Sequence, residues 1–216
     1  MLGKNCPRGN AYAGPTVMTG EMPYREPETV ELSASGLVPV GVQRGYDEDR
    51  RGVRNNPDAE RHVAELLEGF RAAGLPVVHV RHETVEAGSS FHPNRPGVAF
   101  KPAAAPADDE PVVTERGGGA FLGSDLESRL RAAGIERPVL VGFTTDRRVS
   151  TAARIASALG FDPYVVDDAT VAFDRELDGT RYVAEQTHRV ALAQLSGAAA
   201  TVVEAATLLA ALERRT

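Results

Sequence analysis

The sequence predicts an α/β protein with three layers, α/β/α, in which helices cover both faces of a central, mostly parallel sheet of five or six strands. Two observations predict this class. Short apolar runs alternate along the chain with segments whose apolar residues recur at helical spacing, which is the pattern of successive strand–helix units. The runs are apolar throughout instead of alternating with polar residues, as is typical of strands that are buried on both faces.

Length and composition limit the class of protein further. The chain has 216 residues, enough for one stable domain, and its hydrophobic and charged fractions, 42% and 25%, are ordinary for a globular protein. No apolar run approaches the roughly 18 residues of a membrane span, and no signal-peptide pattern opens the chain. A formal net charge of −6 disfavours a nucleic-acid surface. We therefore expect a cytoplasmic protein that binds neither membrane nor nucleic acid.

Residues 1–36 differ from the rest of the chain. They are rich in glycine and proline and have no sustained periodicity, so they predict an irregular N-terminal arm before a domain that spans residues 37–216. The arm is either a floppy extension or a segment laid over a partner subunit. It contains the single cysteine, Cys6, which lies on no strand-to-helix turn. We expect an incidental thiol and no disulfide within the chain.

The first elements of the domain follow in order. Residues 37–42, LVPVGV, predict a short strand. Asn56 as N-cap and Pro57 at the first helical position predict a helix that ends at Gly74. Residues 75–80, LPVVHV, predict the second strand, since the run is short, apolar and rich in valine.

The remaining elements repeat this alternation. Residues 83–110 are interrupted by glycine and proline, and a connection of this length in a compact domain is usually a lid or a binding loop. The predicted elements after it are strands at 111–115, 139–141, 161–166 and 200–203, helices at 124–134, 149–159, 181–195 and 204–214, and turns at 142–146 and 167–170.

Polar residues at the ends of predicted strands are the first candidates for a site, because open α/β sheets bind ligands at the carboxyl ends of their strands. His82 follows the strand at 75–80, and it is either a group for chemistry or a structural hydrogen-bond donor. His79 lies inside that strand, and we expect a packed core histidine. In the long connection Phe91, His92 and Phe100 can line a pocket. No cluster of side chains predicts a metal site, and we expect no cofactor.

Three segments together carry a family resemblance. Residues 142–154 read GFTTDRRVSTAAR, which resembles the signature G-x-x-T-D-x-C-V-x-x-T-A-R of the isochorismatase-like cysteine hydrolases, except that Arg148 replaces the nucleophilic cysteine. Residues 41–46, GVQRGY, resemble the family's D-x-Q-x-G-F/Y. Residues 113–126, VTERGGGAFLGSDL, resemble V-x-K-x-x-x-S-A-F-x-G-T-D-L. The likeness covers residues 37–209 or so.

The resemblance implies the isochorismatase-like, Rossmann-type fold, often with a cis peptide near Phe143–Thr144, and homo-oligomers such as dimers or tetramers. It also places the family's catalytic aspartate on Gly41, its lysine on Glu115 and its cysteine on Arg148. None of these residues can do the original chemistry, because arginine is not nucleophilic, glycine has no side chain and glutamate has the opposite charge to lysine. We expect cysteine-based hydrolysis to be lost and Glu115 to form an ion pair with Arg148.

Three functions remain open. In the first, which we favour, the pocket is kept for a non-covalent acid/base reaction on a small, secondary-metabolite-like substrate: cyclisation, elimination, isomerisation or acid-assisted hydrolysis. Glu115 would be the acid or base, Arg148 would bind an anionic group, and His82 or His92 would assist. The predicted substrate-binding residues are Gly41, Tyr46, His92, Phe121, Thr144, Thr145 and Arg147. The alternatives are a non-catalytic relative that binds a small molecule or stabilises a partner protein, and a decayed enzyme.

Overall fold

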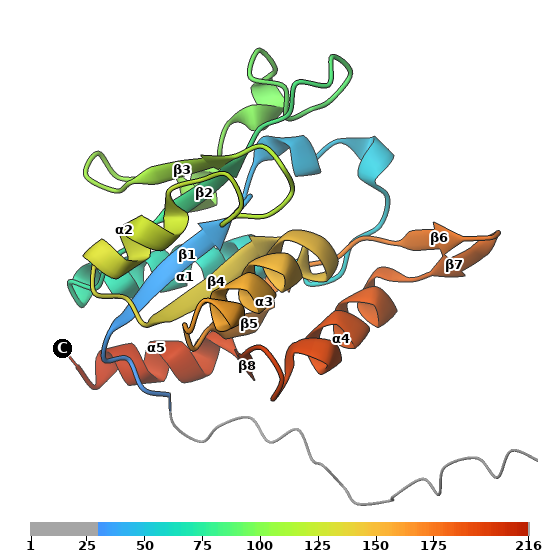
Figure 1. Ribbon diagram of the computed structural model, residues 1–216. Helices are drawn as coiled ribbons and strands as arrows, with labels where there is room; N and C mark the ends of the chain where they lie inside the picture. Colours follow the sequence, from blue (N-terminus) through green and yellow to red (C-terminus); the bar gives the residue numbers. More distant parts are fainter. Residues whose placement is uncertain (1–29, 216) are drawn as a thin grey trace, which may run out of the picture.

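A computed structural model describes residues 30–215 as a sheet between two layers of helices (Figure 1). The predicted arm, residues 1–36, lies mostly outside this part, so its form and its role stay predictions. The strands are β1 (Ser35–Val40), β2 (His79–His82), β3 (Val112–Glu115), β4 (Arg137–Phe143), β5 (Tyr164–Val171), β6 (Arg175–Leu177), β7 (Thr180–Tyr182) and β8 (Thr201–Val203). The α-helices are α1 (Ala59–Ala72), α2 (Leu126–Ala132), α3 (Ser150–Ala158), α4 (Ala184–Leu195) and α5 (Ala205–Glu213).

Six of the strands form one sheet in the order β3-β2-β1-β4-β5-β8, and every pair in it is parallel. The predicted class and its parallel sheet are confirmed. The chain leaves β1 toward β2 and β3 on one side and then crosses to β4, β5 and β8 on the other. β1 and β4 therefore flank the point where the strand order reverses, which is where open α/β sheets place their ligand crevice.

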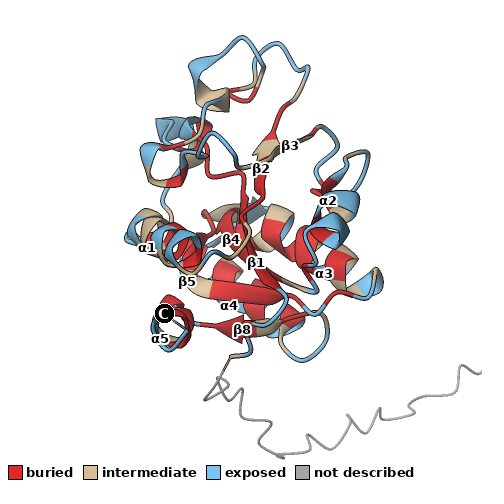
Figure 2. Ribbon diagram, turned by 90° about the vertical axis from the view of Figure 1, so that its left-hand side faces the viewer, coloured by how far each residue is buried: buried red, intermediate tan, exposed pale blue. Residues whose placement is uncertain are grey.

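The two faces of the sheet bury separate apolar clusters. Alternate residues of each strand point to opposite faces, so Leu37 packs with the apolar sides of α1 and α5, whereas Val38 packs with those of α2, α3 and α4. Figure 2 shows most of the sheet as buried, between helices whose outer sides are exposed. Because both faces are covered, the strands read as uninterrupted apolar runs in the sequence.

The predicted start of the first helix is wrong. α1 begins at Ala59, two residues after Pro57, and Asn56 adopts a positive φ of 42° instead of capping the helix. Its side-chain amide Nδ2 donates to the backbone carbonyls of Asp167 and Thr170, at 2.8 Å in each case. A short polar side chain that tolerates the left-handed region is used here to join two distant segments.

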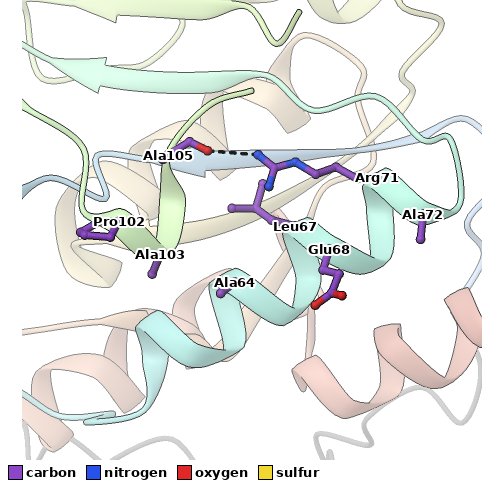
Figure 3. A pocket seen from close by; sticks show the side chains of 8 residues that line it. All are labelled: Ala64, Leu67, Glu68, Arg71, Ala72, Pro102, Ala103 and Ala105. Atoms are coloured by element: carbon purple, nitrogen blue, oxygen red, sulfur yellow. Dashed lines mark hydrogen bonds between the residues drawn. The ribbon is translucent and has the colours of Figure 1, made fainter. Parts of the chain in front are cut away.

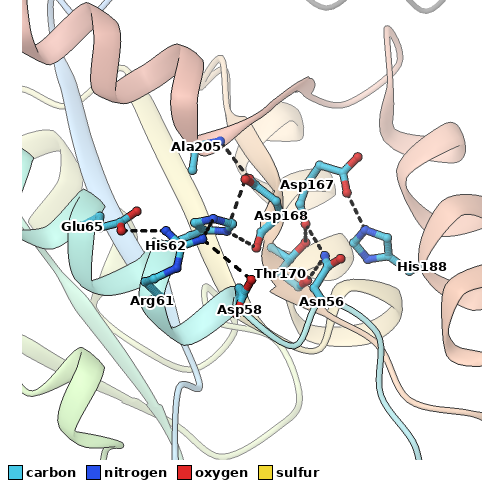
Figure 4. A network of polar contacts seen from close by, with 10 residues as sticks. All are labelled: Asn56, Asp58, Arg61, His62, Glu65, Asp167, Asp168, Thr170, His188 and Ala205. Carbon is cyan, nitrogen blue, oxygen red and sulfur yellow. Dashed lines mark hydrogen bonds and ion pairs between the residues drawn. The ribbon is translucent and has the colours of Figure 1, made fainter.

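The predicted turn at residues 167–170 is also wrong, because β5 continues through it to Val171. A register shift opposite β4 accommodates these polar residues. Asp167 pairs with His188 of α4 at 2.7 Å, while Asp168 accepts from the backbone N–H of Ala205 at 2.8 Å and lies 3.2 Å from His62 of α1. Figure 4 shows these contacts, through which the two neighbouring aspartates connect β5 to helices on opposite faces of the sheet.

A β-hairpin of β6 and β7 precedes α4, and the sequence analysis missed it. The predicted helix at 181–195 is correct only from Ala184 onward. Asp178 and Gly179 form the hairpin turn, both at positive φ, 50° and 74°, and Asp-Gly is a strong signal for such a two-residue turn. The signal was obscured because both strands have three residues each and lie at the surface, outside the main sheet.

Glu110 joins the loop before β3 to the helix layer. Its carboxylate accepts two hydrogen bonds from Arg71 of α1, at 2.7 Å each, and lies 2.8 Å from Nε2 of His79. His79 is fully buried, as predicted for a core histidine. Burial raises the pKa of Glu110, but the bonds from Arg71, the backbone N–H of Ala107 and His79 outweigh it and hold the pKa at about 2.

This lowered pKa predicts a loss of stability in acid. A carboxylate whose pKa is lower in the folded than in the unfolded chain stabilises the fold above the unfolded value, here 4.5, and that contribution is lost as the pH falls toward 2. We expect Glu110→Gln to cost up to about 3 kcal/mol at pH 7 and almost nothing at pH 2. Urea unfolding of both proteins across this range measures the difference.

Glu127→Gln is the matched control for that experiment. Glu127 pairs with Arg131 one turn along α2, and its side chain is 41% exposed. An exposed pair of this kind contributes about 0.5 kcal/mol or less. If Glu110→Gln behaved like Glu127→Gln at pH 7, the buried carboxylate would not stabilise the fold in the way described.

Candidate active site

Four strand ends meet at the carboxyl edge of the sheet. Gly41 directly follows β1, and Thr144 directly follows β4, joined to Phe143 by the cis peptide that the family resemblance implies. β2 ends at His82 and β3 at Glu115, and these two residues are paired in register. Parallel pairing thus brings the predicted His82 and Glu115 side by side, although 33 positions separate them in the sequence.

Glu115 is the centre of the polar contacts at this edge. Its side chain is only 2% exposed. Oε1 contacts both Nη1 of Arg148 and Nδ1 of His82, the latter at 2.7 Å, and Oε2 accepts from the backbone N–H of Gly118 at 2.8 Å. The predicted ion pair between Glu115 and Arg148 is confirmed. Among residues 30–215, Nδ1 of His82 has no hydrogen-bond partner of good geometry, so its approach to Glu115 is a short polar contact.

Glu115 is ionised at neutral pH. Burial raises the pKa of its carboxyl, but the contact with His82, the charge of Arg148 and the Gly118 N–H together hold the pKa below its usual value. An ionised carboxylate has no proton to give, and one with a lowered pKa is a weak base. The predicted role of Glu115 as a general acid or base stays a prediction, and its contacts also suit a role in positioning its neighbours.

Arg148 is held from two sides. It extends from the π-helical turn Thr145–Val149 that precedes α3. Nη1 binds Glu115, and Nε donates to the Tyr46 hydroxyl at 2.9 Å. Tyr46 in turn lies with its hydroxyl 3.4 Å from the carbonyl oxygen of Phe143 and its ring stacked on the Phe143 ring, with centroids 5.3 Å apart. The arginine side chain therefore has a fixed direction across the ends of the strands.

Gly41 does not open the space that its sequence position suggests. Its φ is +62°, and a Cβ added there would lie 3.0 Å from the carbonyl oxygen of Phe143 and 3.5 Å from Cδ of Arg148. The stem of Arg148 thus passes over the residue. We expected the missing side chain at Gly41 to enlarge a pocket, and the space beside it is instead taken by the arginine.

The long connection before β3 covers the group around Arg148 and Glu115. Phe91 of that connection packs on the group, and Gln43, which lies outside the connection, holds it in place. Phe91 places its ring 4.9 Å from that of Tyr46 and 5.2 Å from that of His82, measured between centroids. Gln43 is fully buried. Its amide binds the backbone of His82 in both directions and also donates to the carbonyl of Val98 at 2.8 Å. The connection is therefore a tethered cover at this edge.

The other predicted binding residues do not converge on Glu115. Thr145 is buried with its hydroxyl 2.9 Å from Nδ1 of His188, on the side of α4. Phe121 packs toward Phe161, with centroids 6.1 Å apart, in the apolar cluster under α2 and α3. Both side chains have partners within the fold, and their predicted roles in binding substrate stay predictions.

The last three residues predicted to bind substrate are His92, Arg147 and Thr144, and none of them belongs to the cluster around Glu115. His92 accepts from the backbone N–H of Asn94 at 3.2 Å, which stabilises a turn within the long connection. Arg147 is exposed on the π-helical turn. Thr144 is buried, and its hydroxyl has no hydrogen-bond partner among the described residues. Their predicted roles in binding substrate stay predictions.

Two surface grooves lie away from this edge. One, of about 530 Å³, runs between α1 and the segment around Pro102, and Arg71 crosses one end of it to reach the carbonyl of Ala105 (Figure 3). The other, of about 830 Å³, lies between the C-terminal ends of α1 and α2. Neither groove is lined by the residues that contact Glu115. Among residues 30–215, no three His, Cys, Asp or Glu side chains converge as metal ligands, and no helix is long and apolar enough to cross a bilayer.

Comparisons with known proteins agree with this architecture. The family model described as the isochorismatase domain matches residues 35–207. The isochorismatase family protein YrdC of Bacillus subtilis (strain 168) is 37% identical over 168 residues, which are 77% of this chain and 90% of that protein. The secreted isochorismatase effector Isc1 of Verticillium dahliae is 33% identical over 177 residues, covering 82% of this chain and 91% of the effector.

A solved structure shows the same fold. The crystal structure of an isochorismatase-family protein from Chromobacterium violaceum superposes with a TM-score of 0.82 at 36% sequence identity, and it covers 86% of this chain and 97% of the other. The region that matches the isochorismatase-domain model, residues 35–207, contains the whole six-stranded sheet and the edge at which Glu115 lies. The chain belongs to the isochorismatase family.

Proposed function

We propose that this chain is an isochorismatase-family enzyme in which Gly41, Glu115 and Arg148 occupy the family's aspartate, lysine and cysteine positions. Cysteine-based hydrolysis is lost in it. Its reaction is a non-covalent acid/base conversion of a small molecule, such as a cyclisation, an elimination, an isomerisation or an acid-assisted hydrolysis. A homo-oligomeric assembly and a cytoplasmic location remain predictions that accompany this proposal.

The observation that carries the proposal is the contact of one buried carboxylate with both an imidazole and a guanidinium. Imidazole is the side chain best suited to exchange protons near neutral pH. A carboxylate beside it fixes its orientation and stabilises its protonated form, as in many acid/base sites. Glu115 lies 2.7 Å from Nδ1 of His82, while Arg148 balances the carboxylate's charge.

The roles follow from which atoms remain free. His82 transfers the proton, through the ring nitrogen that does not face Glu115. Glu115 positions His82 and stays charged. Arg148 uses Nε for Tyr46 and Nη1 for Glu115, so that Nη2 is left to bind an anionic oxygen on the substrate or one that develops charge during the reaction. No covalent intermediate is needed for any of these steps.

A non-catalytic binding protein is the alternative, and one observation favours it. The carboxylate of Glu115 has partners on both oxygens, and the arginine stem lies over Gly41. A site whose charged groups satisfy one another can be a structural plug that replaces a catalytic cleft. The alternative predicts that the protein binds a small molecule or a partner protein without converting it.

Turnover assays on variants separate the two functions. The purified protein is incubated with a set of small organic acids, enol ethers and lactones, and products are followed by mass spectrometry. For any compound that is converted, His82→Asn should lower kcat by about 100-fold or more, since a positioned proton-transfer group contributes on that scale. Cys6→Ser should leave kcat unchanged, because the cysteine has no part in the reaction.

His62→Asn is the control for loss of an imidazole outside the site, since His62 lies on α1 beside Asp168, and it should keep wild-type turnover. If Cys6→Ser removed the activity while His82→Asn kept it, the proposed chemistry would be wrong. Binding of a compound by calorimetry without any conversion, across the whole set, would favour the non-catalytic alternative.

A further inference from the structure

Arg51 lies at the end of the short 3-10 helix Asp49–Arg51 and reaches back over the aromatic cover of the site. Its guanidinium carbon is 5.3 Å from the centre of the Tyr46 ring and 4.9 Å from the centre of the Phe91 ring. Stacking on two rings holds a guanidinium in place while leaving its edge available. The side chain is partly buried.

The hydrogen bonds of Arg51 leave most of its donors unused. Nε donates to the carbonyl of Gly45 at 3.1 Å, and Nη2 lies at a long 3.4 Å from the hydroxyl of Ser90. A guanidinium has five N–H donors in a planar fork. Neither contact neutralises its charge, because both partners are uncharged oxygens.

Among the described residues, Arg51 has no carboxylate partner, whereas the two arginines near it do. Arg50 pairs with Glu48 at 2.6 Å, and Arg148 pairs with Glu115. Within residues 30–215, no carboxylate lies at ion-pair distance from Arg51. Burial lowers the pKa of Arg51, as do the charges of Arg50 and Arg148, and the opposing effects of Tyr46 and of the carboxylate of Glu48 do not outweigh them. A partly buried charge without a partner is unfavourable, so an anion that arrives there is stabilised.

Phe91 connects Arg51 to the candidate active site. The same ring that Arg51 covers lies 5.9 Å from the guanidinium carbon of Arg148 and 5.2 Å from the ring of His82. Arg51, Arg148 and His82 therefore share the Phe91 ring as a neighbour, which places Arg51 at the margin of the candidate site. The two arginines differ in their present partners: Arg148 contacts the carboxylate of Glu115, whereas Arg51 contacts uncharged oxygens.

We propose that Arg51 is a specificity-determining residue that binds a small oxyanion, a carboxylate or a phosphate, on the ligand of this site. Its planar fork matches two oxygens of either group. The assignment of the far end of the ligand to His82 rests on the proposed function, whereas anion binding by Arg51 does not. Binding without turnover is therefore its proper test.

The experiment measures binding to the full-length protein by calorimetry with benzoate, inorganic phosphate and benzamide. Benzamide has the shape of benzoate without the charge. We expect the wild type to bind benzoate or phosphate at least tenfold more tightly than benzamide, and Arg51→Gln to lose that preference. Arg51→Lys, which keeps the charge without the fork, should retain part of it. Arg50→Gln is the matched control and should keep all of it.

Each outcome decides the question. Benzoate preference alone identifies a carboxylate site, and phosphate preference alone identifies a phosphate site. If no anion binds the wild type better than benzamide, or if Arg51→Gln keeps the preference, the proposal is overturned. Should Arg51→Gln fail to fold, Arg51→Lys against Arg50→Gln still tests the role of the fork. Loss of turnover in His82→Asn with anion binding unchanged separates this proposal from the proposed reaction.

Discussion

Arg148→Met should lower the free energy of unfolding by about 3–5 kcal/mol, because it leaves the carboxylate of Glu115 buried without its main cation. Glu115 is 2% exposed, and its remaining partners are the imidazole of His82 and the N–H of Gly118. Methionine has a similar length and keeps the apolar contact of the arginine stem over Gly41. Urea unfolding at pH 7 measures the change in the free energy of unfolding. Because methionine keeps the apolar contact, that change reports the loss of the charge.

The neighbouring residue provides the control. Arg147 lies on the same π-helical turn and is exposed, so that Arg147→Met should change stability by about 0.5 kcal/mol or less. A loss below about 1 kcal/mol for Arg148→Met would contradict the description of a buried charge pair. It would mean that water or His82 satisfies Glu115 equally well.

Gly142→Ala should cost about 4 kcal/mol or prevent folding. Gly142 lies in β4 at a φ of +117°, and a Cβ there would lie 2.2 Å from the carbonyl oxygen of Val40 and 2.9 Å from Cγ2 of Val42. Neither backbone strand can move away without breaking the β1–β4 pairing. The strain of the backbone and the steric overlap add to one another. Thermal unfolding followed by circular dichroism measures the effect.

Gly160→Ala is the comparison that separates strain from steric overlap. Gly160 follows α3 with a φ of +86°, and a Cβ there would meet nothing within 4 Å. Backbone strain alone should cost about 1–2 kcal/mol. Equal effects of the two substitutions would show that the close approach of β1 and β4 at Gly142 is not tight.

Much of the fold could be predicted from the sequence because the buried strands are continuous apolar runs with few alternatives. Where polar residues lie inside a strand, as at Asp167 and Asp168, the same reasoning predicts a turn, since nothing local shows that two helices lie there to receive the carboxylates. Asn56 resembled a helix cap for a related reason. Its true partners are backbone carbonyls more than one hundred positions away.

The residues of the candidate site could likewise be predicted only in part. Glu115, His82 and Arg148 could be predicted because each ends a strand or begins the helix after it, and parallel strands bring such ends together. Arg51 was missed because it lies in a charged loop whose path over Tyr46 and Phe91 is set by tertiary packing. Thr145 and Phe121 were predicted to bind substrate because they lie in the motifs, and the motifs do not show that Thr145 contacts His188 and that Phe121 packs toward Phe161.

The most direct test of the ionic centre at the carboxyl edge is a double-mutant cycle on Glu115 and Arg148. Glu115→Gln, Arg148→Met and the double variant are unfolded in urea at pH 7 under identical conditions. We predict a coupling free energy of about 2 kcal/mol or more, with the double variant more stable than the sum of the single losses implies. Additive losses, within about 0.5 kcal/mol, would contradict the claim that these two residues form one buried pair.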